Sequence, residues 1–117
     1  MVTLREFVQA LRRQSGVEAA VVVGRDGLLI DSAADTAVHA DGLAARVPAL
    51  VAAAVATGAP VGRGGLSMAV LEYERGSAIV SQMSPDVWLL VLVHPQGPLA
   101  TLLQDLRRYR HQITALA

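Results

Sequence analysis

The spacing of apolar residues at the start of the chain predicts a helix. Apolar side chains recur at helical intervals between residues 4 and 14. Thr3 and Glu6 frame the first turn as a capping box, in which the hydroxyl and the carboxylate each accept a hydrogen bond from a backbone amide. We therefore expect a helix over 4–14 that stops near Gly16.

The next segment, 17–32, has the pattern of a β-hairpin. Two runs of β-branched and other apolar residues flank the tripeptide Arg-Asp-Gly at 25–27. Asp-Gly is a strong signal for a tight turn between paired strands. The first run, 17–24, is apolar at successive positions, so we expect a strand that is buried on both faces.

Residues 37–57 are rich in alanine and predict a second helix, because their aliphatic side chains recur at helical spacing. Gly42 and Pro48 interrupt this pattern. A proline inside a helix removes one hydrogen bond and clashes with the preceding turn. We expect either a kink or a helix whose well-formed part begins near Val47.

Three further strands are predicted at 66–74, 77–83 and 87–93, with short turn segments between them. The last of these runs is apolar on both faces. The first is expected to share one apolar face among Leu66, Met68 and Val70. A final helix follows Gly97-Pro98, with proline at its favoured first position. Its buried stripe is expected to comprise Leu99, Leu102, Leu103, Leu106, Tyr109, Ile113 and Leu116.

The predicted element order is α-β-β-α-β-β-β-α, which fits a single α/β (α+β) domain over residues 1–117. Strands that are apolar on both faces must be central in a sheet covered on both sides. Hairpins link the first strand to the second, the third to the fourth, and the fourth to the fifth. The prediction is a five-stranded antiparallel sheet of order 2-1-5-4-3 with helices on both faces.

The third strand, 66–74, becomes a free edge of this sheet. It is long and largely apolar, contains no proline, and carries charge only at Glu72 and Glu74. Such an edge is an aggregation hazard unless another strand pairs with it. Pairing with a second copy across a two-fold axis would remove the hazard, so we expect a homodimer with one ten-stranded sheet.

Composition favours a folded chain in the cytoplasm. Hydrophobic residues make up 53% and charged residues 17%, which is too apolar for a disordered chain. We find no apolar run of the roughly 18 residues needed to span a bilayer, no apolar signal-peptide core, and no cysteine. We expect no integral membrane association. The formal net charge of +0 argues against nucleic acid as a partner, because that needs a basic footprint.

Missing residue types exclude several classes of enzyme. All ten basic residues are arginine, and without lysine or cysteine there is no P-loop lysine, Schiff base, thiolate nucleophile or cysteine zinc site. His39, His94 and His111 lie on different elements, and His94 is expected to be a partly buried structural residue. We therefore expect no enzymatic activity, no metal and no cofactor.

Two other candidates carry little functional signal. A Ser-His-Asp set can be written from Ser81, His94 and Asp86, but their spacing does not support it and the chain has no Gly-x-Ser-x-Gly motif. Trp88, the only tryptophan, falls on a predicted central strand. We expect it to belong to the core.

Charge is distributed unevenly along the chain. The first and last helices, which should share one face of the sheet, carry six arginines against two acids, a net of +4. The remainder carries four arginines against eight acids, a net of −4. Such a dipole can orient docking, although arginines near helix C-termini are also ordinary. If this face matters, charge reversal of Arg107 and Arg108 should weaken association with a partner or a membrane without unfolding the chain.

The run GVEAAVVVGRDGLLIDSA at 16–33, together with the predicted sheet, resembles the roadblock/LC7 family, including the bacterial MglB-like proteins. LEYERGSAIVSQM at 71–83 is similar to that family's hairpin between its third and fourth strands. The resemblance covers nearly the whole chain. It implies a roadblock/profilin-like fold and a homodimer joined through strand 66–74 and helix 37–57. It also implies a partner, because proteins of this family commonly bind and regulate Ras-like small GTPases or act as scaffold subunits.

We therefore interpret the chain as a non-catalytic homodimeric regulator or scaffold that binds a small Ras-like GTPase. The dimer-interface candidates are Leu66, Met68, Val70, Glu72, Leu50 and Val51. The candidates for partner contact are His39, Asp41, Arg46 and Arg63. The alternative is a small-ligand sensor of profilin- or GAF-like architecture, which would need a roomy pocket.

Arg63 has two interpretations. It lies in the glycine-rich loop 62–65, where it could act as an arginine finger on the transferring phosphate of a GTPase. It could instead be a solvated loop residue, which is the interpretation we favour, because a regulator can act by repositioning the GTPase's own switch loops. A phosphate-binding loop is disfavoured, since the segment leads into a strand and offers no helix N-terminus to an anion.

Overall fold

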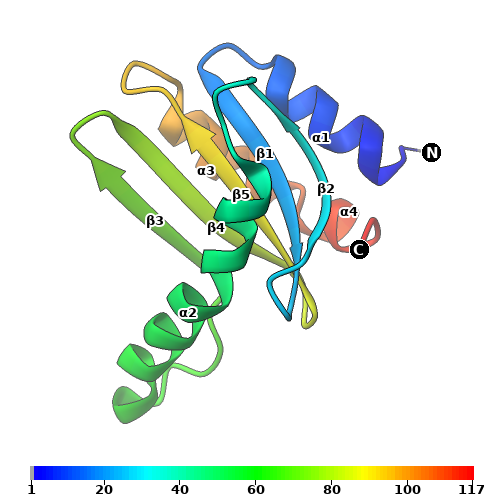
Figure 1. Ribbon diagram of the computed structural model, residues 1–117. Coiled ribbons are helices and arrows are strands. Elements are labelled where there is room, and N and C mark those ends of the chain that lie inside the picture. The colour runs from blue at the N-terminus through cyan, green and yellow to red at the C-terminus, as the bar shows by residue number, and fades with distance from the viewer. Residues whose placement is uncertain (1) are drawn as a thin grey trace.

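The chain forms an antiparallel sheet with helices on both of its faces, as Figure 1 shows for the computed structural model, which describes residues 2–117. The helices are α1 (Leu4–Arg13), α2 (Ala40–Gly58), α3 (Leu99–Arg108) and α4 (Arg110–Thr114), with a short 3-10 helix, η1 (Ala59–Val61), after α2. The strands are β1 (Val17–Gly24), β2 (Leu29–Ala34), β3 (Met68–Tyr73), β4 (Gly76–Ser84) and β5 (Val87–Val93).

The N-terminal signals in the sequence are confirmed. Thr3 Oγ1 accepts a hydrogen bond from the Glu6 amide at 3.1 Å, and the Glu6 carboxylate accepts one from the Thr3 amide at 3.2 Å. The turn between β1 and β2 uses Gly27 at φ 85°, a left-handed conformation that glycine adopts without strain. A Cβ at Gly27 would lie 3.2 Å from Pro48 Cγ, so this turn packs tightly against α2.

The strand order is β2-β1-β5-β4-β3, and every pairing is antiparallel. This confirms the predicted sheet. β1 and β5 are central because their side chains are buried on both faces, and Trp88 is part of this core as expected. β2 and β3 form the two edges.

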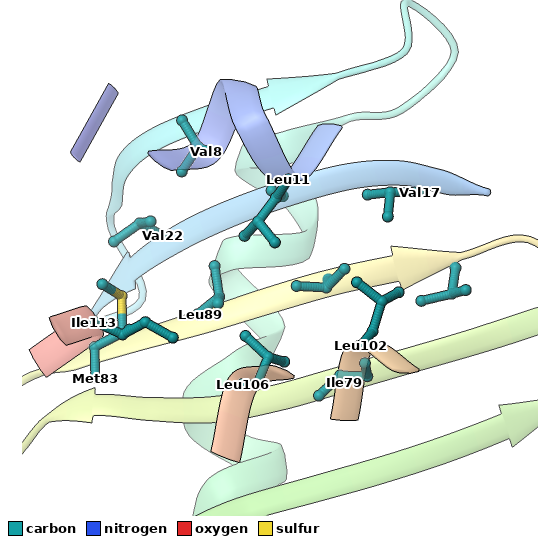
Figure 2. Close-up of a cluster of buried hydrophobic side chains, with 13 residues drawn as sticks. Val8, Leu11, Val17, Val22, Ile79, Met83, Leu89, Leu102, Leu106 and Ile113 are labelled. Atoms are coloured by element: carbon teal, nitrogen blue, oxygen red, sulfur yellow. The ribbon is translucent and has the colours of Figure 1, made fainter. Parts of the chain in front are cut away.

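The two faces of the sheet carry separate cores. Figure 2 shows the α1-side core, where side chains of α1, α3 and α4 meet the sheet. It contains Val8, Leu11, Val17, Ala20, Val22, Ile79, Met83, Leu89, Val91, Val93, Leu102, Leu106 and Ile113. The α2-side core contains Ala19, Val21, Val23, Ala44, Val47, Ala78, Val80, Trp88 and Leu90. The first and last helices therefore share one face, and α2 lies on the other (Figure 1).

The second and last helices differ from their predicted forms. α2 runs unbroken from Ala40 through Pro48, so the expectation that its well-formed part begins near Val47 is wrong. The last helix is interrupted at Tyr109, which leaves helical geometry at φ −101° and ψ 23°. Tyr109 is also 45% exposed, because it lies at this break and not in the buried stripe where we expected it.

The third strand is shorter than the predicted 66–74, because pairing with β4 begins at Met68 and ends at Tyr73. Leu66 lies in the preceding loop and packs against the α2-side core, whereas Met68 packs against the α1-side core. The prediction that Leu66 shares a face with Met68 is therefore wrong. Strand alternation does not extend into the loop.

The expectation that no segment is long and apolar enough to span a membrane is wrong for one helix. Among the described residues, the segment Ala40–Val61 is long and apolar enough to cross a membrane by length and composition alone, and little of it is buried. The sequence pattern predicts no segment of this kind. The other described residues therefore cover little of α2 and η1.

We expect Gly76→Ala to reduce the free energy of unfolding by about 3 kcal/mol, measured by urea denaturation. Gly76 has φ 133°, and a Cβ there would lie only 2.6 Å from the Val93 carbonyl oxygen. Gly64→Ala is the control, because Gly64 has φ 77° but open space around it. Its loss should be about 1 kcal/mol. Equal losses in the two variants would contradict the steric explanation.

Candidate interaction surfaces

Large apolar side chains remain exposed on three parts of the fold. One part comprises α2, η1 and β3, with Val55 and Val61 on the helices and Val70 and Tyr73 on opposite faces of the strand. A second group, Val2 and Tyr109, lies beside α1 and α4. The third group, Leu28 and Ile30, is at the β1–β2 turn, near the Arg25–Asp86 ion pair of 3.6 Å. Exposed apolar clusters of this kind are typical of protein-binding surfaces.

The outer edge of β3 offers backbone hydrogen-bonding groups to a partner strand. β3 pairs with β4 alone. The Ser67 carbonyl accepts a hydrogen bond from the Gln82 amide at 2.9 Å. Because antiparallel strands alternate the direction of these groups, the amides and carbonyls of Met68, Val70 and Glu72 point away from β4. These three residues are dimer-interface candidates from the sequence, and they carry the open edge.

The C-terminal half of α2 is poorly covered. The residues of α2 that are fully buried, Ala44 and Val47, both lie in its first half. Figure 1 shows the second half extending past the sheet. Leu50 and Val51 pack partly against the α2-side core and are only half-buried. These two dimer-interface candidates on α2 therefore lie where the rest of the protomer stops covering the helix.

The face of β3 on the α2 side is also incompletely covered. α2 contacts β1 and β2. Ala69 and Leu71 of β3 are directed toward the α2-side core but remain half-buried. An additional helix on this face would complete their burial.

The structure separates the four candidates for partner contact. His39, Asp41 and Arg46 are exposed within the first two turns of α2 or just before it. Arg63 is exposed in the loop after η1, at the other end of the helix. Since α2 has 19 residues, its ends lie about 29 Å apart. Within one chain, Arg63 is therefore not part of the same surface as the other three.

The structure does not bring His94 and Asp86 of the candidate Ser81-His94-Asp86 set together. Asp86 and His94 flank the two ends of β5, which has 7 residues, so they lie roughly 25 Å apart. His94 is 65% exposed, with its Nε2 3.9 Å from Glu18 Oε1, which corrects the expectation of a partly buried residue. Within residues 2–117, no group of three or more His, Cys, Asp or Glu is placed to hold a metal ion.

A groove of about 940 Å³ lies between α1 and the α3–α4 pair. It is lined by Val2, Thr3, Leu4, Phe7, Leu11, Gln14, Leu102, Asp105, Leu106, Tyr109, Gln112, Ile113, Ala115 and Leu116. Sequence reasoning missed this groove, because helical periodicity reports which side of a helix is apolar and not how far apart two helices stand. The only signal was an apolar stripe on each helix.

The Roadblock/LC7 domain model matches residues 3–93. The chain belongs to the Roadblock/LC7 family. This roadblock chain also resembles three uncharacterized proteins of Methanocaldococcus jannaschii. One is 30% identical over 106 residues, which covers 91% of this chain and 89% of that protein. Another is 29% identical over 106 residues, covering 91% of this chain and 92% of its relative.

Solved structures of low sequence identity share the roadblock fold. A structure described as MglB with tetrameric arrangement is 20% identical, with a TM-score of 0.83 over 96% of this chain and 85% of that one. The gliding protein MglB from Thermus thermophilus gives the same identity and TM-score, over 96% and 86%. A Roadblock/LC7 domain from Streptomyces avermitilis is 22% identical, with a TM-score of 0.73 over 92% and 98%. The predicted fold class and family are thus confirmed.

Proposed function

We propose that this roadblock chain is a cytoplasmic, non-catalytic homodimer that binds a small Ras-like GTPase as regulator or scaffold. The observation that carries the proposal is the open edge of β3. Beside this edge, the second half of α2 is also left uncovered by the protomer. Two copies related by a two-fold axis would pair their β3 strands into one ten-stranded sheet. Family membership supports the GTPase as the partner.

In the proposed dimer, α2 would add a second contact by packing over the sheet. In a two-fold arrangement, α2 of one copy can extend over β3 of the other, where Ala69 and Leu71 lack full cover. Leu50 and Val51 are the α2 residues we place in this contact, with Leu66 beside them in the loop. A standard interface of this kind buries roughly 1,600 Å² in total.

Dimerisation would also assemble the surface for the partner. The exposed residues at the start of α2, His39, Asp41 and Arg46, are far from Arg63 within one chain. In a dimer that places the two α2 helices side by side and antiparallel, Arg63 of one copy would approach the start of α2 in the other. The GTPase would then contact a composite surface that a single chain does not possess.

Binding should be tested with each small Ras-like GTPase of the source organism, purified and loaded with GDP or with a non-hydrolysable GTP analogue. We expect one of them to bind the dimer in titration calorimetry with an affinity that depends on the nucleotide. Arg46→Glu should weaken this binding by about tenfold or more. Arg13→Glu is the matched control, because Arg13 is also exposed but lies on α1, on the sheet face opposite α2. The proposal fails if none of these GTPases binds in either nucleotide state.

Arg63→Ala should change the rate of GTP hydrolysis by less than about threefold. Loss of a true arginine finger lowers that rate by about 10³-fold or more, so a single-turnover hydrolysis assay separates the two roles. Arg63 is exposed, and its guanidinium donates to the Val61 carbonyl at 3.4 Å within its own loop. A collapse of the rate in Arg63→Ala, with binding retained, would instead assign Arg63 as a finger.

A further inference from the structure

The sheet has a second edge, β2, and its pairing with β1 shows which of its backbone groups face outward. The Asp35 amide donates to the Glu18 carbonyl at 3.1 Å, and the stretch 31–34 continues this pairing in regular register before the register shifts near the turn. Because antiparallel strands alternate the direction of these groups, the amides and carbonyls of Ser32 and Ala34 point away from β1. A regular free edge of this kind is open to pairing with another strand unless something blocks it.

Side chains occupy both outward backbone groups of Ser32. Its amide donates to Asp31 Oδ1 at 2.8 Å, and its carbonyl accepts a hydrogen bond from Arg5 Nη1 at 3.4 Å. The same Nη1 atom lies 3.3 Å from Asp31 Oδ1, so a carboxylate and a guanidinium together cover this part of the edge. The Asp31 side chain is largely buried although it is charged, which shows that it is held against the strand.

The start of α1 places Arg5 over this edge. The capping box of Thr3 and Glu6 fixes where the helix begins, and α1 packs against β1 and β2 (Figure 1). Arg5 therefore lies in the first helical turn, from which its long side chain reaches the Ser32 carbonyl. The ion pair with Asp31 is partly exposed and adds little to the stability of the fold. Its position on the strand-pairing groups is what distinguishes it from an ordinary surface pair.

The two edges of the sheet differ in this respect. Among residues 2–117, no side chain is hydrogen-bonded to the backbone of β3. The outward groups of Met68, Val70 and Glu72 are therefore available to a partner strand. A strand that approached β2 would first have to displace two charged side chains from Ser32, and charges placed on an edge in this way disfavour pairing.

We propose that Arg5 and Asp31 determine which edge of the sheet pairs with a second copy, by closing the β2 edge and leaving β3 open. A chain with one open edge forms a closed pair, whereas a chain with two open edges can add copies without limit. The limit to two copies rests on the β3 dimer of the proposed function. The closure of the β2 edge does not, because all of its contacts lie within one chain.

The test opens the β2 edge in a chain whose β3 edge is blocked. Val70→Pro removes an outward amide of β3, and Arg5→Ala with Asp31→Ala frees both backbone groups of Ser32. We expect this triple variant to pair through β2, with a dissociation constant at least about tenfold below that of Val70→Pro alone. Sedimentation velocity at several concentrations measures the difference, and circular dichroism verifies that the chains are folded. Without Val70→Pro, the Arg5→Ala/Asp31→Ala chain should form species larger than a dimer that grow with concentration.

Arg12→Ala with Asp35→Ala is the matched control in the same Val70→Pro background. It removes the other ion pair between α1 and the end of β2 with the same change in net charge, and it leaves the hydrogen bonds of Ser32 in place. This control should remain a single chain. Asp31→Asn should also remain a single chain, because its side-chain oxygen can still accept the Ser32 amide.

A triple variant that sediments as the same single chain as Val70→Pro overturns the proposal. So does a control, or Asp31→Asn, that associates as strongly as the triple variant. If Arg5→Ala/Asp31→Ala does not fold, Arg5→Ala alone decides in its place, because Arg5 is exposed and its removal frees the Ser32 carbonyl. Pairing then supports the proposal and a single chain overturns it. An unmodified chain that is monomeric contradicts the β3 dimer alone, since the comparison in the Val70→Pro background still tests the β2 edge.

Discussion

If the chain forms the proposed dimer, Val70→Pro is expected to separate it into single chains while leaving each chain folded. The Ser67 carbonyl accepts a hydrogen bond from the Gln82 amide of β4. Because backbone groups alternate in direction along a strand, the amide of Val70, three residues later, points away from β4 toward the open edge. Proline removes a donor that the single chain does not use, and edge strands tolerate it for that reason. A paired β3 strand of a second copy would lose this donor and meet the proline ring.

Symmetry would make the effect large, because the proposed dimer would contain the substitution twice. A buried carbonyl left without its donor costs about 1–3 kcal/mol, so two of them should raise the dissociation constant of the dimer by roughly 100-fold or more. Sedimentation velocity at several concentrations measures this change. Val70→Ala keeps the amide and only shortens a side chain that is 37% exposed, so this control should remain dimeric.

Two outcomes would contradict the β3 interface. The first is a Val70→Pro protein that sediments as the same dimer as the unmodified chain. The second is an unmodified chain that is monomeric at micromolar concentration, with the β3 edge in solvent. Urea denaturation of Val70→Pro shows whether the single chain has kept its fold, so unfolding cannot be mistaken for dissociation.

The sheet order was predictable because its evidence is local and redundant. The Asp-Gly turn before Leu28, the short turn before β4 and the turn between β4 and β5 each specify one hairpin. The continuous apolar runs of β1 and β5 then require both strands to be central. With three hairpins and two central strands, only one order of five strands remains, and it is the order observed.

Other features depend on tertiary contacts that no local pattern reports. Pro48 was expected to kink the second helix or to delay its well-formed part to about Val47. α2 instead begins at Ala40 and continues through Pro48, with Gly27 of the neighbouring turn packed against the proline ring. Leu66 has the pattern of a strand residue, yet pairing with β4 begins only at Met68. In both cases packing between segments distant in the sequence decided the local structure.

The residues of the candidate surfaces also fall into those that the sequence predicts and those that depend on tertiary contacts. The edge residues Met68, Val70 and Glu72 could be selected from the sequence, because a free edge follows from strand order alone. The exposed Tyr73 (64% exposed) and the groove around Tyr109 could not. Their exposure depends on the exact end of a strand and on the distance between two helices. The hydrophobic periodicity of the sequence specifies neither of these.

Leu89→Ala is expected to have the largest effect on stability, lowering the free energy of unfolding by about 4 kcal/mol. Leu89 is on the central strand β5, is 0% exposed, and belongs to the α1-side core between the sheet and the helices (Figure 2). Rigid neighbours on both adjacent strands, Val22 and Ser81, limit how far the chain can collapse into the vacated space. The cavity would therefore persist.

Urea denaturation of Leu89→Ala should be measured in the Val70→Pro background, so that loss of core packing is not mixed with loss of the dimer. Leu28→Ala is the control, because Leu28 is 67% exposed and its truncation should change stability by less than about 0.5 kcal/mol. A single chain of this kind is stable by only about 5–15 kcal/mol, so Leu89→Ala removes a large share of the total. A loss below about 1 kcal/mol would mean that the α1-side helices settle onto the sheet when the side chain is removed.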